Sequence, residues 1–150
     1  MERSAKRGSI RHHIRIDCSA AAAWRVVGKP EILHHWFPGI LACVVDGNSR
    51  TITVGTGMQM PETILTNDAL QMRFQYRIST PIFKEHLASV DVISLSDSEC
   101  LVTYCTDAEP ASMALMISGG TLGALGELKR QCEAGVGPAI DAAEAIEGAR

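Results

Sequence analysis

A single uncharged stretch near the end of the chain constrains the fold more than any other feature. No charged residue occurs from Pro110 to Gly126, and apolar residues recur there at three- and four-residue spacings, which indicates an α-helix. Pro110 suits the first position of a helix and Gly135 suits its end, so we predict one long helix over residues 109–134. We expect its first half to be buried on most sides and its second half to be amphipathic. The predicted apolar face comprises Leu115, Leu122, Leu125, Leu128 and Cys132.

Four glycines, at positions 119, 120, 123 and 126, lie inside this predicted helix. Each costs about 1 kcal/mol relative to alanine in a helix interior, so a packing or functional reason is expected. Gly119, Gly123 and Gly126 share one face of the helix. The favoured interpretation is close packing against a sheet, or a kink. The alternatives are room for a bound molecule and contact with a second copy of the chain in a homodimer.

The chain before this helix is predicted to form short strands joined by turns. Alternation is cleanest over residues 69–79, where Leu70, Met72, Phe74, Tyr76 and Ile78 share one face that we assign to the core. Further strands are predicted at residues 9–16, 41–45, 50–54, 58–66, 86–95 and 100–106, with short helices at 20–27 and 31–36.

Strands that follow one another through tight turns pair antiparallel, and a sheet of this size curls rather than lying flat. We therefore predict an α+β fold in which a curved antiparallel sheet of about seven strands closes around the long C-terminal helix, with two short helices after the first strand. The 150 residues form one domain in this prediction. Its core spans 9–134, and the tail at 135–150 is weakly helical and frays.

Charge and cysteine content narrow the classes of function. The net charge of −3 at pH 7 argues against non-specific nucleic-acid binding, because that binding requires a basic surface. The five cysteines have scattered spacings and no Cys-x-x-Cys, which is typical of a reduced cytoplasmic protein. The uncharged run is shorter than the ~20 residues of a membrane span and no signal peptide is visible, so we expect no membrane segment.

Short motifs carry a resemblance to a known superfamily. They are AWRVVG at 23–28, HHWFP at 34–38 and ETILTND at 62–68. Together with the order of elements they resemble the helix-grip fold of the START-like superfamily, also called SRPBCC, and above all its bacterial polyketide-cyclase-like branch. The resemblance covers residues 10–133 and implies an internal apolar cavity between the sheet and the long helix, with loops at 55–60 and 80–85 beside its mouth. The chain lacks the gate sequence and ligand-pairing lysine of the plant abscisic-acid receptors in this superfamily, so no hormone-receptor role is expected.

Glu62 is the sharpest candidate for chemistry. By alternation it shares a face with Met60 and Ile64, and burial among apolar groups disfavours the charged form of a carboxylate. Such a carboxylate can act as a general acid or base near neutral pH. The resemblance implies that a glutamate at this position faces the cavity. The alternative is a carboxylate at the rim, or one paired with Arg73 or Arg77.

Two tyrosines complete the trial catalytic set. Tyr76 and Tyr104 lie among apolar neighbours, where core packing is favoured over contact with a ligand. His86 begins a strand near the predicted mouth and is a candidate ligand contact, although a surface position is favoured. The histidine pairs at 12–13 and 34–35 do not have the spacing of zinc ligands, so we expect no metal and no cofactor.

The first functional hypothesis is binding of a small hydrophobic ligand, such as a polyketide, a lipid or an isoprenoid. The second is an enzyme of the cyclase or dehydratase type, in which Glu62 and a tyrosine move a proton. A third, weaker hypothesis is a partner-associated module with a filled core. Binding is favoured, because catalytic groups are few and methionines provide an adaptable wall. The predicted ligand contacts are Trp36, Met58, Met60, Phe74, His86, Met116, Gly119 and Leu122.

Overall fold

One antiparallel sheet contains every strand within residues 6–150. The structure, a computed structural model, describes residues 6–150. The sheet order is β1-β7-β6-β5-β4-β3-β2, so β1 and β2 are its edges. The strands are β1 (Gly8–Ile16), β2 (Ile40–Asp46), β3 (Ser49–Val54), β4 (Gln59–Asp68), β5 (Arg73–Ile78), β6 (Glu85–Ser96) and β7 (Glu99–Glu109). The helices are α1 (Ala20–Val27), the 3₁₀ helix η1 (Pro30–His35), α2 (Ala111–Ala134) and α3 (Pro138–Gly148).

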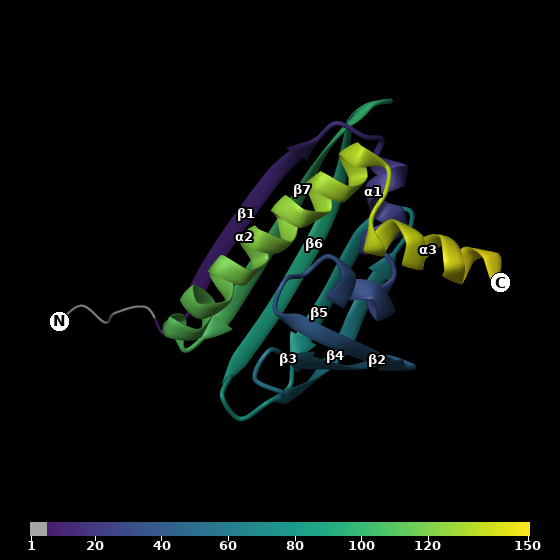
Figure 1. The fold of residues 1–150 in the computed structure, drawn as a ribbon. Helices are drawn as coiled ribbons and strands as arrows, with labels where there is room; N and C mark the ends of the chain where they lie inside the picture. Colours follow the sequence, from purple (N-terminus) through teal and green to yellow (C-terminus); the bar gives the residue numbers. More distant parts are fainter. Residues whose placement is uncertain (1–5) are drawn as a thin grey trace.

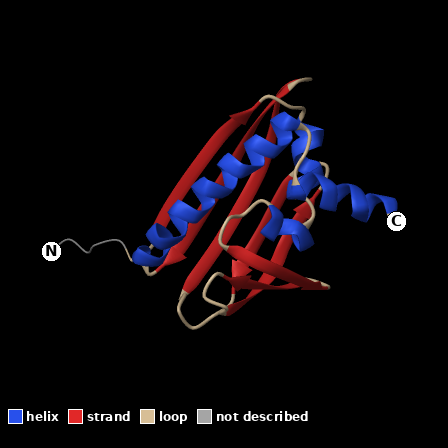
Figure 2. Ribbon diagram, viewed as in Figure 1, coloured by secondary structure: helices blue, strands red, loops and turns tan. Residues whose placement is uncertain are grey.

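The long helix α2 lies on one face of the sheet, along β1 and β7 (Figure 1). The shorter helices α1, η1 and α3 contact one another and lie together beside the C-terminal half of α2 (Figure 2). The prediction of a seven-stranded antiparallel sheet with a long C-terminal helix and two short helices after the first strand is therefore confirmed. The core fills the space between the helices and the inner face of the sheet.

The two short helices form where local sequence signals place them. The Ser19 hydroxyl accepts a hydrogen bond from the backbone N–H of Ala22 at 3.1 Å, which caps the start of α1. Gly28 ends this helix, and its N–H donates to the carbonyl of Trp24. Pro30 occupies the first turn of η1, where its missing N–H costs nothing. Trp36 follows η1 directly and is buried in the core.

The start of the predicted strand at 69–79 is wrong. Strand β5 begins at Arg73, and Leu70 lies in the preceding turn with 98% of its surface exposed. The Asp68 carboxylate accepts hydrogen bonds from the N–H groups of Leu70 and Gln71, which closes a tight turn. Met72 completes the turn with a positive φ of 54°. The apolar alternation of the strand continues through Leu70 and Met72, although these residues lie in the turn. The hydrogen bonds of Asp68 determine the backbone conformation there.

The prediction that the first half of α2 is buried is also wrong. Leu115 and Met116 are 71% and 74% exposed, whereas the small residues Ala114 and Ala124 are fully buried against the sheet. Small residues let the helix lie close to β1: a Cβ added at Gly8 would come within 2.7 Å of the Ala114 Cβ. The close approach therefore uses alanines of α2 and a glycine of the strand. Of the predicted apolar face, Leu125, Leu128 and Cys132 are buried, and Leu115 and Leu122 are exposed.

Close packing does not explain most of the helix glycines. A Cβ built at Gly119, Gly123 or Gly126 would have no neighbour within 4 Å, so these three glycines face open space. Only Gly120 faces inward, where a Cβ would lie 3.1 Å from the ring of Phe37. Close packing, the first of the two favoured interpretations, is therefore wrong for the three glycines that share a face.

The C-terminal segment forms helix α3 instead of a fraying tail. Ala139 and Ala143 are buried, and the fully buried Gln131 of α2 holds the start of α3. The Gln131 side chain accepts from the Ala139 N–H at 2.8 Å and donates to the His35 carbonyl at 2.9 Å. At the other end, the Glu147 carboxylate bonds Arg25 of α1. The side-chain amide of Gln131 thus links α2 to both η1 and α3.

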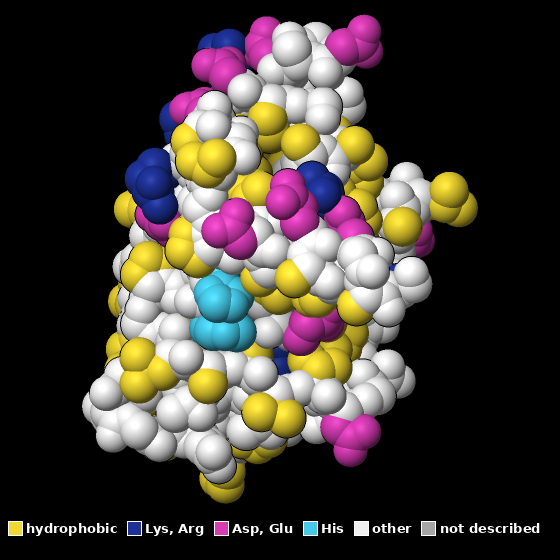
Figure 3. Space-filling view, turned by 45° about the vertical axis from the view of Figure 1, so that its right-hand side comes forward, with side chains coloured by type: hydrophobic (Ala, Val, Ile, Leu, Met, Phe, Trp, Pro, Cys, Tyr) yellow, Lys and Arg dark blue, Asp and Glu magenta, His cyan; other side chains and the backbone are white. Residues whose placement is uncertain are grey.

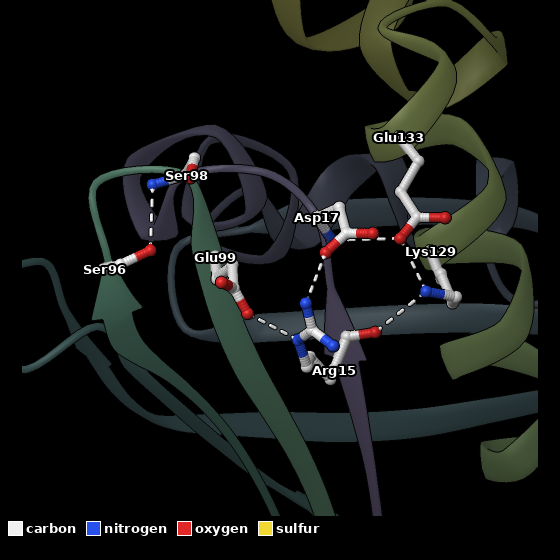
Figure 4. Close-up of polar contacts among 7 residues, drawn as sticks. All are labelled: Arg15, Asp17, Ser96, Ser98, Glu99, Lys129 and Glu133. Carbon is white, nitrogen blue, oxygen red and sulfur yellow. Dashed lines mark hydrogen bonds and ion pairs between the residues drawn. The ribbon is translucent and has the colours of Figure 1, made fainter.

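A polar network fixes the C-terminal half of α2 to β1 and β7 (Figure 4). Arg15 donates to Glu99 at 2.5 Å and to Asp17 at 3.0 Å, and the Asp17 N–H donates to Glu133 at 2.9 Å. Lys129 bonds both Glu133 and the Arg15 carbonyl. The contacts are exposed, so each contributes little to stability, and together they link β1, β7 and α2.

The surface mixes residue types. On the face shown in Figure 3, hydrophobic side chains are scattered among polar ones, and histidine side chains lie side by side near the middle. None of the helices within residues 6–150 has both the length and the hydropathy of a transmembrane helix.

Candidate functional site

A cavity of about 200 Å³ lies between α2 and the strands β2 to β5. Its walls are mostly apolar, and Met116 of α2 stands at its rim, since that side chain lines the cavity and is largely exposed. Glu62 and Tyr76 are the polar side chains that reach the wall. The lining residues are Phe37, Ile40, Ile52, Val54, Met60, Glu62, Tyr76, Ile78, Met116, Ile117 and Gly120.

A buried ion pair supports the polar side of this cavity. Arg50 of β3 stands directly opposite Glu62 of β4 in the sheet, and the Arg50 Nε donates to Glu62 Oε1 at 2.6 Å. Both side chains are about 1% exposed. The guanidinium also donates to the Pro30 carbonyl and stacks 4.8 Å from the centre of the Tyr76 ring. Glu62 is therefore held in one position by a residue on the adjacent strand.

The ionisation of Glu62 reflects two opposing effects. Burial raises the pKa of its carboxyl above the usual value, and the charge and hydrogen bond of Arg50 oppose that rise. Arg50 itself stays charged, because a guanidinium does not lose its proton in proteins. The proposed alternative that Glu62 is a rim carboxylate, or pairs with Arg73 or Arg77, is wrong: the carboxyl is buried and its partner is Arg50.

Tyr76 and Tyr104 join hydroxyl to hydroxyl at 2.6 Å. Both lie in the core, where burial raises the pKa of each phenol well above its usual range. Tyr76 reaches the cavity wall, whereas Tyr104 lies behind it, beside a void of about 10 Å³ that Trp36 also lines. Within residues 6–150, Trp36 Nε1 and Arg50 Nη2 are buried without a hydrogen-bond partner. Two unpaired hydrogen-bond donors therefore belong to residues that line this small void.

His86 closes a gap in the sheet. Pairing between β5 and β6 stops at Tyr76 opposite Ala88, and beyond it the Ile78 N–H donates to His86 Nδ1 at 3.0 Å. The proton of the neutral ring is therefore on Nε2. The side chain is buried, and burial lowers the pKa of His86 to about 4. The surface position favoured for His86 from the sequence is wrong, because the side chain is buried. Its imidazole accepts the hydrogen bond of the Ile78 N–H in place of a backbone carbonyl of β6.

The structure brings some of the predicted site residues together and separates others. Glu62, Tyr76, Met60 and Met116 line the main cavity. Trp36, Phe74 and Tyr104 line the small void behind it, and His86 borders an open groove of about 730 Å³ formed by the loop at 79–85. Met58, Gly119 and Leu122 line none of these three spaces: Met58 and Leu122 are about half exposed, and Gly119 faces outward where Gly120 faces in.

Arg50 is the site residue that the sequence interpretation missed. Its signal was present, because Arg50, Ile52 and Val54 alternate along one strand and so share a face. An arginine in the same register as two core residues indicates a buried cation that needs an acidic partner. Among the described residues, no group of three or more histidine, cysteine or acidic side chains is arranged to hold a metal ion.

A curved antiparallel sheet that holds a long helix over an apolar cavity is the helix-grip arrangement. The model of the family "Polyketide cyclase / dehydrase and lipid transport" matches residues 7–133, and the chain belongs to this family. A comparison with curated proteins gives no match.

Solved structures show the same fold at low sequence identity. XoxI from Bacillus cereus is 17% identical with a TM-score of 0.77, covering 82% of this chain and 94% of that one. A START superfamily protein from Mycobacterium smegmatis is 16% identical with a TM-score of 0.71, covering 85% and 99%. The Zhui aromatase/cyclase from Streptomyces is 14% identical with a TM-score of 0.71, covering 85% and 94%.

Proposed function

We propose that this protein binds a small hydrophobic molecule in the cavity between α2 and the sheet. The observation that carries this proposal is the cavity of about 200 Å³, with apolar walls, a rim at Met116 and a fixed carboxyl at one side. Ligand sites are typically concave and apolar, with a few polar groups that set orientation. Membership of a family of cyclases and lipid transporters supports the same function.

The size of the cavity limits the ligand. A protein cavity of about 150 Å³ lined by apolar side chains binds benzene, so about 200 Å³ suits a body of one or two rings. A long acyl chain would have to extend past Met116 into solvent. Among the expected classes, a compact aromatic polyketide or a short isoprenoid therefore fits better than an extended lipid.

The polar groups indicate which functional group the ligand carries. Arg50 uses Oε1 of Glu62, so the second carboxyl oxygen is the acceptor available on the cavity wall. A ligand hydroxyl or enol can donate to it, and such a bond to a carboxylate is stronger than one between neutral groups. The preferred ligand is a compact hydrophobic molecule with one hydroxyl or enol group.

A matched pair of variants on α2 tests the binding site. Ile117→Trp fills the cavity, whereas Leu122→Trp adds the same side chain on the exposed face of the same helix. Titration with 2-naphthol, a fluorescent two-ring molecule with one hydroxyl group, should show one saturable site in the wild type and in Leu122→Trp. Ile117→Trp should bind at least about tenfold more weakly, a loss of roughly 1.4 kcal/mol. Equal binding by both variants would disprove this location.

Native mass spectrometry of the freshly purified protein can identify the natural ligand. An extra mass that disappears on denaturation, and is missing from Ile117→Trp, would give the molecule to extract and identify. The same extra mass on Ile117→Trp would place the ligand elsewhere.

A second function, catalysis of the cyclase or dehydratase type, is favoured by one observation. Glu62 and Tyr76 share the wall of one cavity, and burial raises the pKa of the carboxyl toward the range of a general base. In this function Glu62 removes a proton beside a ligand carbonyl, and the Tyr76 hydroxyl stabilises the resulting enolate. Glu62→Gln should lower turnover of a cyclising substrate by about 100-fold or more. Unchanged turnover in folded Glu62→Gln would refute this assignment.

A further inference from the structure

The hydrogen bond between the two buried tyrosines has a direction that matters for ligand binding. The hydroxyl oxygens of Tyr76 and Tyr104 lie 2.6 Å apart, so one hydroxyl donates its hydrogen and the other accepts it. Within residues 6–150, neither hydroxyl makes a second hydrogen bond. The pair therefore uses one hydrogen and leaves the other without a protein partner. The tyrosine that keeps the free hydrogen determines what a ligand meets in the cavity.

Tyr104 is surrounded by hydrogen-bond donors. The small void beside it is also lined by Lys29, Trp36 and Arg50, and these three side chains can donate but cannot accept. In the described part of the chain, Trp36 Nε1 and Arg50 Nη2 are buried and already have no acceptor. A free hydrogen on Tyr104 would add another unpaired donor to this region, and burying such a donor is unfavourable. Tyr104 should therefore give its hydrogen to Tyr76.

Tyr76 is the member of the pair that lines the ligand cavity, whereas Tyr104 does not line it. Its ring is held in place by Arg50, whose guanidinium carbon lies 4.8 Å from the ring centre. Because the Tyr76 oxygen accepts the hydrogen of Tyr104, its own hydrogen remains available. A ligand in the cavity can accept that hydrogen, whereas the void behind the pair offers it no side-chain acceptor.

We infer that Tyr104 sets Tyr76 as a hydrogen-bond donor toward the ligand, and that the ligand places a carbonyl oxygen against Tyr76. This inference rests on the proposed binding function and narrows its ligand class. Tyr104 is a positioning residue, because it acts through Tyr76 and does not line the cavity. A hydroxyl that accepts one hydrogen bond becomes a stronger donor in another, since bonds in a chain polarise one another.

The cavity wall then offers one acceptor and one donor. Glu62 accepts from a ligand hydroxyl with the carboxyl oxygen that Arg50 does not use, and Tyr76 donates to a ligand carbonyl. Both side chains belong to adjacent strands, β4 and β5. The ligand class that fits is therefore a compact ring system that carries both a hydroxyl and a ketone group.

Two ligands of similar size separate this hydrogen bond from general packing. 1-Tetralone has two rings and one carbonyl, and naphthalene has two rings and no polar group. In calorimetric titrations, Tyr76→Phe and Tyr104→Phe should each weaken 1-tetralone binding by about three- to tenfold and leave naphthalene binding unchanged. Thr106→Val is the matched control, because it removes a buried hydroxyl of β7 that has no hydrogen-bond partner. It should change the affinity for neither ligand.

The carbonyl stretching band of bound 1-tetralone provides a readout that does not depend on affinity. A hydrogen bond to the carbonyl oxygen weakens the C=O bond, so the band should lie at lower frequency in the wild type than in Tyr76→Phe. In Tyr104→Phe the band should move part of the way to the higher frequency, since Tyr76 is then a weaker and less well-oriented donor. A tyrosine with a purely structural role would not move this band.

The opposite hydrogen-bond direction predicts the opposite result. If Tyr76 donated to Tyr104, Tyr104→Phe would release the Tyr76 hydrogen, and 1-tetralone would bind more tightly. Tighter or unchanged 1-tetralone binding in Tyr104→Phe would overturn the inference, while intact naphthalene binding would keep the cavity as the ligand site. Equal weakening of both ligands would overturn it as well, because Tyr104 would then only shape the cavity. Absence of naphthalene binding to the wild type would overturn the proposed function, and this inference with it.

Discussion

Among single residues, Arg50 and Glu62 should matter most for the stability of the site, because their charged side chains are about 1% exposed. Removing one member of a buried ion pair leaves an uncompensated charge and costs about 3–5 kcal/mol, whereas replacing both members by apolar residues is often neutral. Arg50→Met should therefore lower the free energy of unfolding by about 3–5 kcal/mol. The double variant Arg50→Met/Glu62→Leu should recover most of that loss. Urea unfolding measures both, and a double variant no more stable than the single one would contradict this view of the pair.

His86 makes stability depend on pH. Its pKa is about 4 in the folded protein and about 6.5 in the unfolded chain, so between these values the unfolded chain binds more protons. Stability should thus be complete above pH 6.5 and fall by about 3 kcal/mol as the pH drops toward 4. His86→Asn should remove this part of the pH dependence, while His13→Asn, at an exposed position of β1, should keep it. Parallel pH profiles of all three proteins would refute the role of His86.

At the residue scale, the sequence indicated that Glu62 and Tyr76 face the cavity, but it did not indicate which residue holds Glu62 in place. Glu62 and Tyr76 were recognisable because period-two alternation identifies the buried face of a strand. The burial of Arg50 was readable from its alternation with Ile52 and Val54, but its pairing with Glu62 was not, because cross-strand register is not visible in a single segment. For the same reason, the arginines of β5 appeared to be the available partners of Glu62.

At the scale of elements, α2 contains glycines that its own packing does not need. A Cβ at Gly123 would meet nothing within 4 Å, so Gly123→Ala should stabilise the protein by about 1 kcal/mol. Gly120→Ala should gain less, because its Cβ would press against the Phe37 ring at 3.1 Å. Thermal unfolding compares the two variants directly. A loss of stability in Gly123→Ala would show that the outer face of α2 is not free.

Helix α3 depends on one side chain of α2. Replacing Gln131 by leucine would leave the buried Ala139 N–H and the His35 carbonyl without partners, at a cost of about 1–3 kcal/mol. Arg130→Leu, on the exposed side of the same turn, is the control. Hydrogen exchange should show faster exchange across residues 138–148 in Gln131→Leu alone. Unchanged protection there would mean that α3 is held by its other contacts.

The elements predicted best were those with local start and stop signals. Residues 20–27 form α1 as predicted, because Ser19 and Gly28 cap them, and the end of α2 at Ala134 follows from Gly135. Burial along α2 was predicted poorly, since it depends on how closely the helix approaches β1. Only small residues such as Ala114 fit where α2 lies close to β1. The pattern of large apolar residues does not reveal this requirement.

At the scale of the whole molecule, the order of elements was sufficient to predict the fold. Successive hairpins impose an antiparallel sheet, and a long apolar helix at the end of the chain needs the inner face of that sheet. The volume of the cavity could not be predicted, because it is the space left after side chains from β2 to β5, α2 and the loop after η1 have packed. Only the assembled structure shows that this space is about 200 Å³.

The methionines allow the most direct test of the central claim, that the space between α2 and the sheet is the ligand site. Met60 and Met116 line the cavity, whereas Met58 and Met72 do not. We would record methyl NMR spectra of methionine-labelled protein during titration with 2-naphthol, a two-ring molecule with one hydroxyl group. The account predicts saturable shifts of the Met60 and Met116 methyl signals, with those of Met58 and Met72 unchanged. Saturable shifts confined to Met58 or Met72 would contradict it, because the probe would then occupy a different surface.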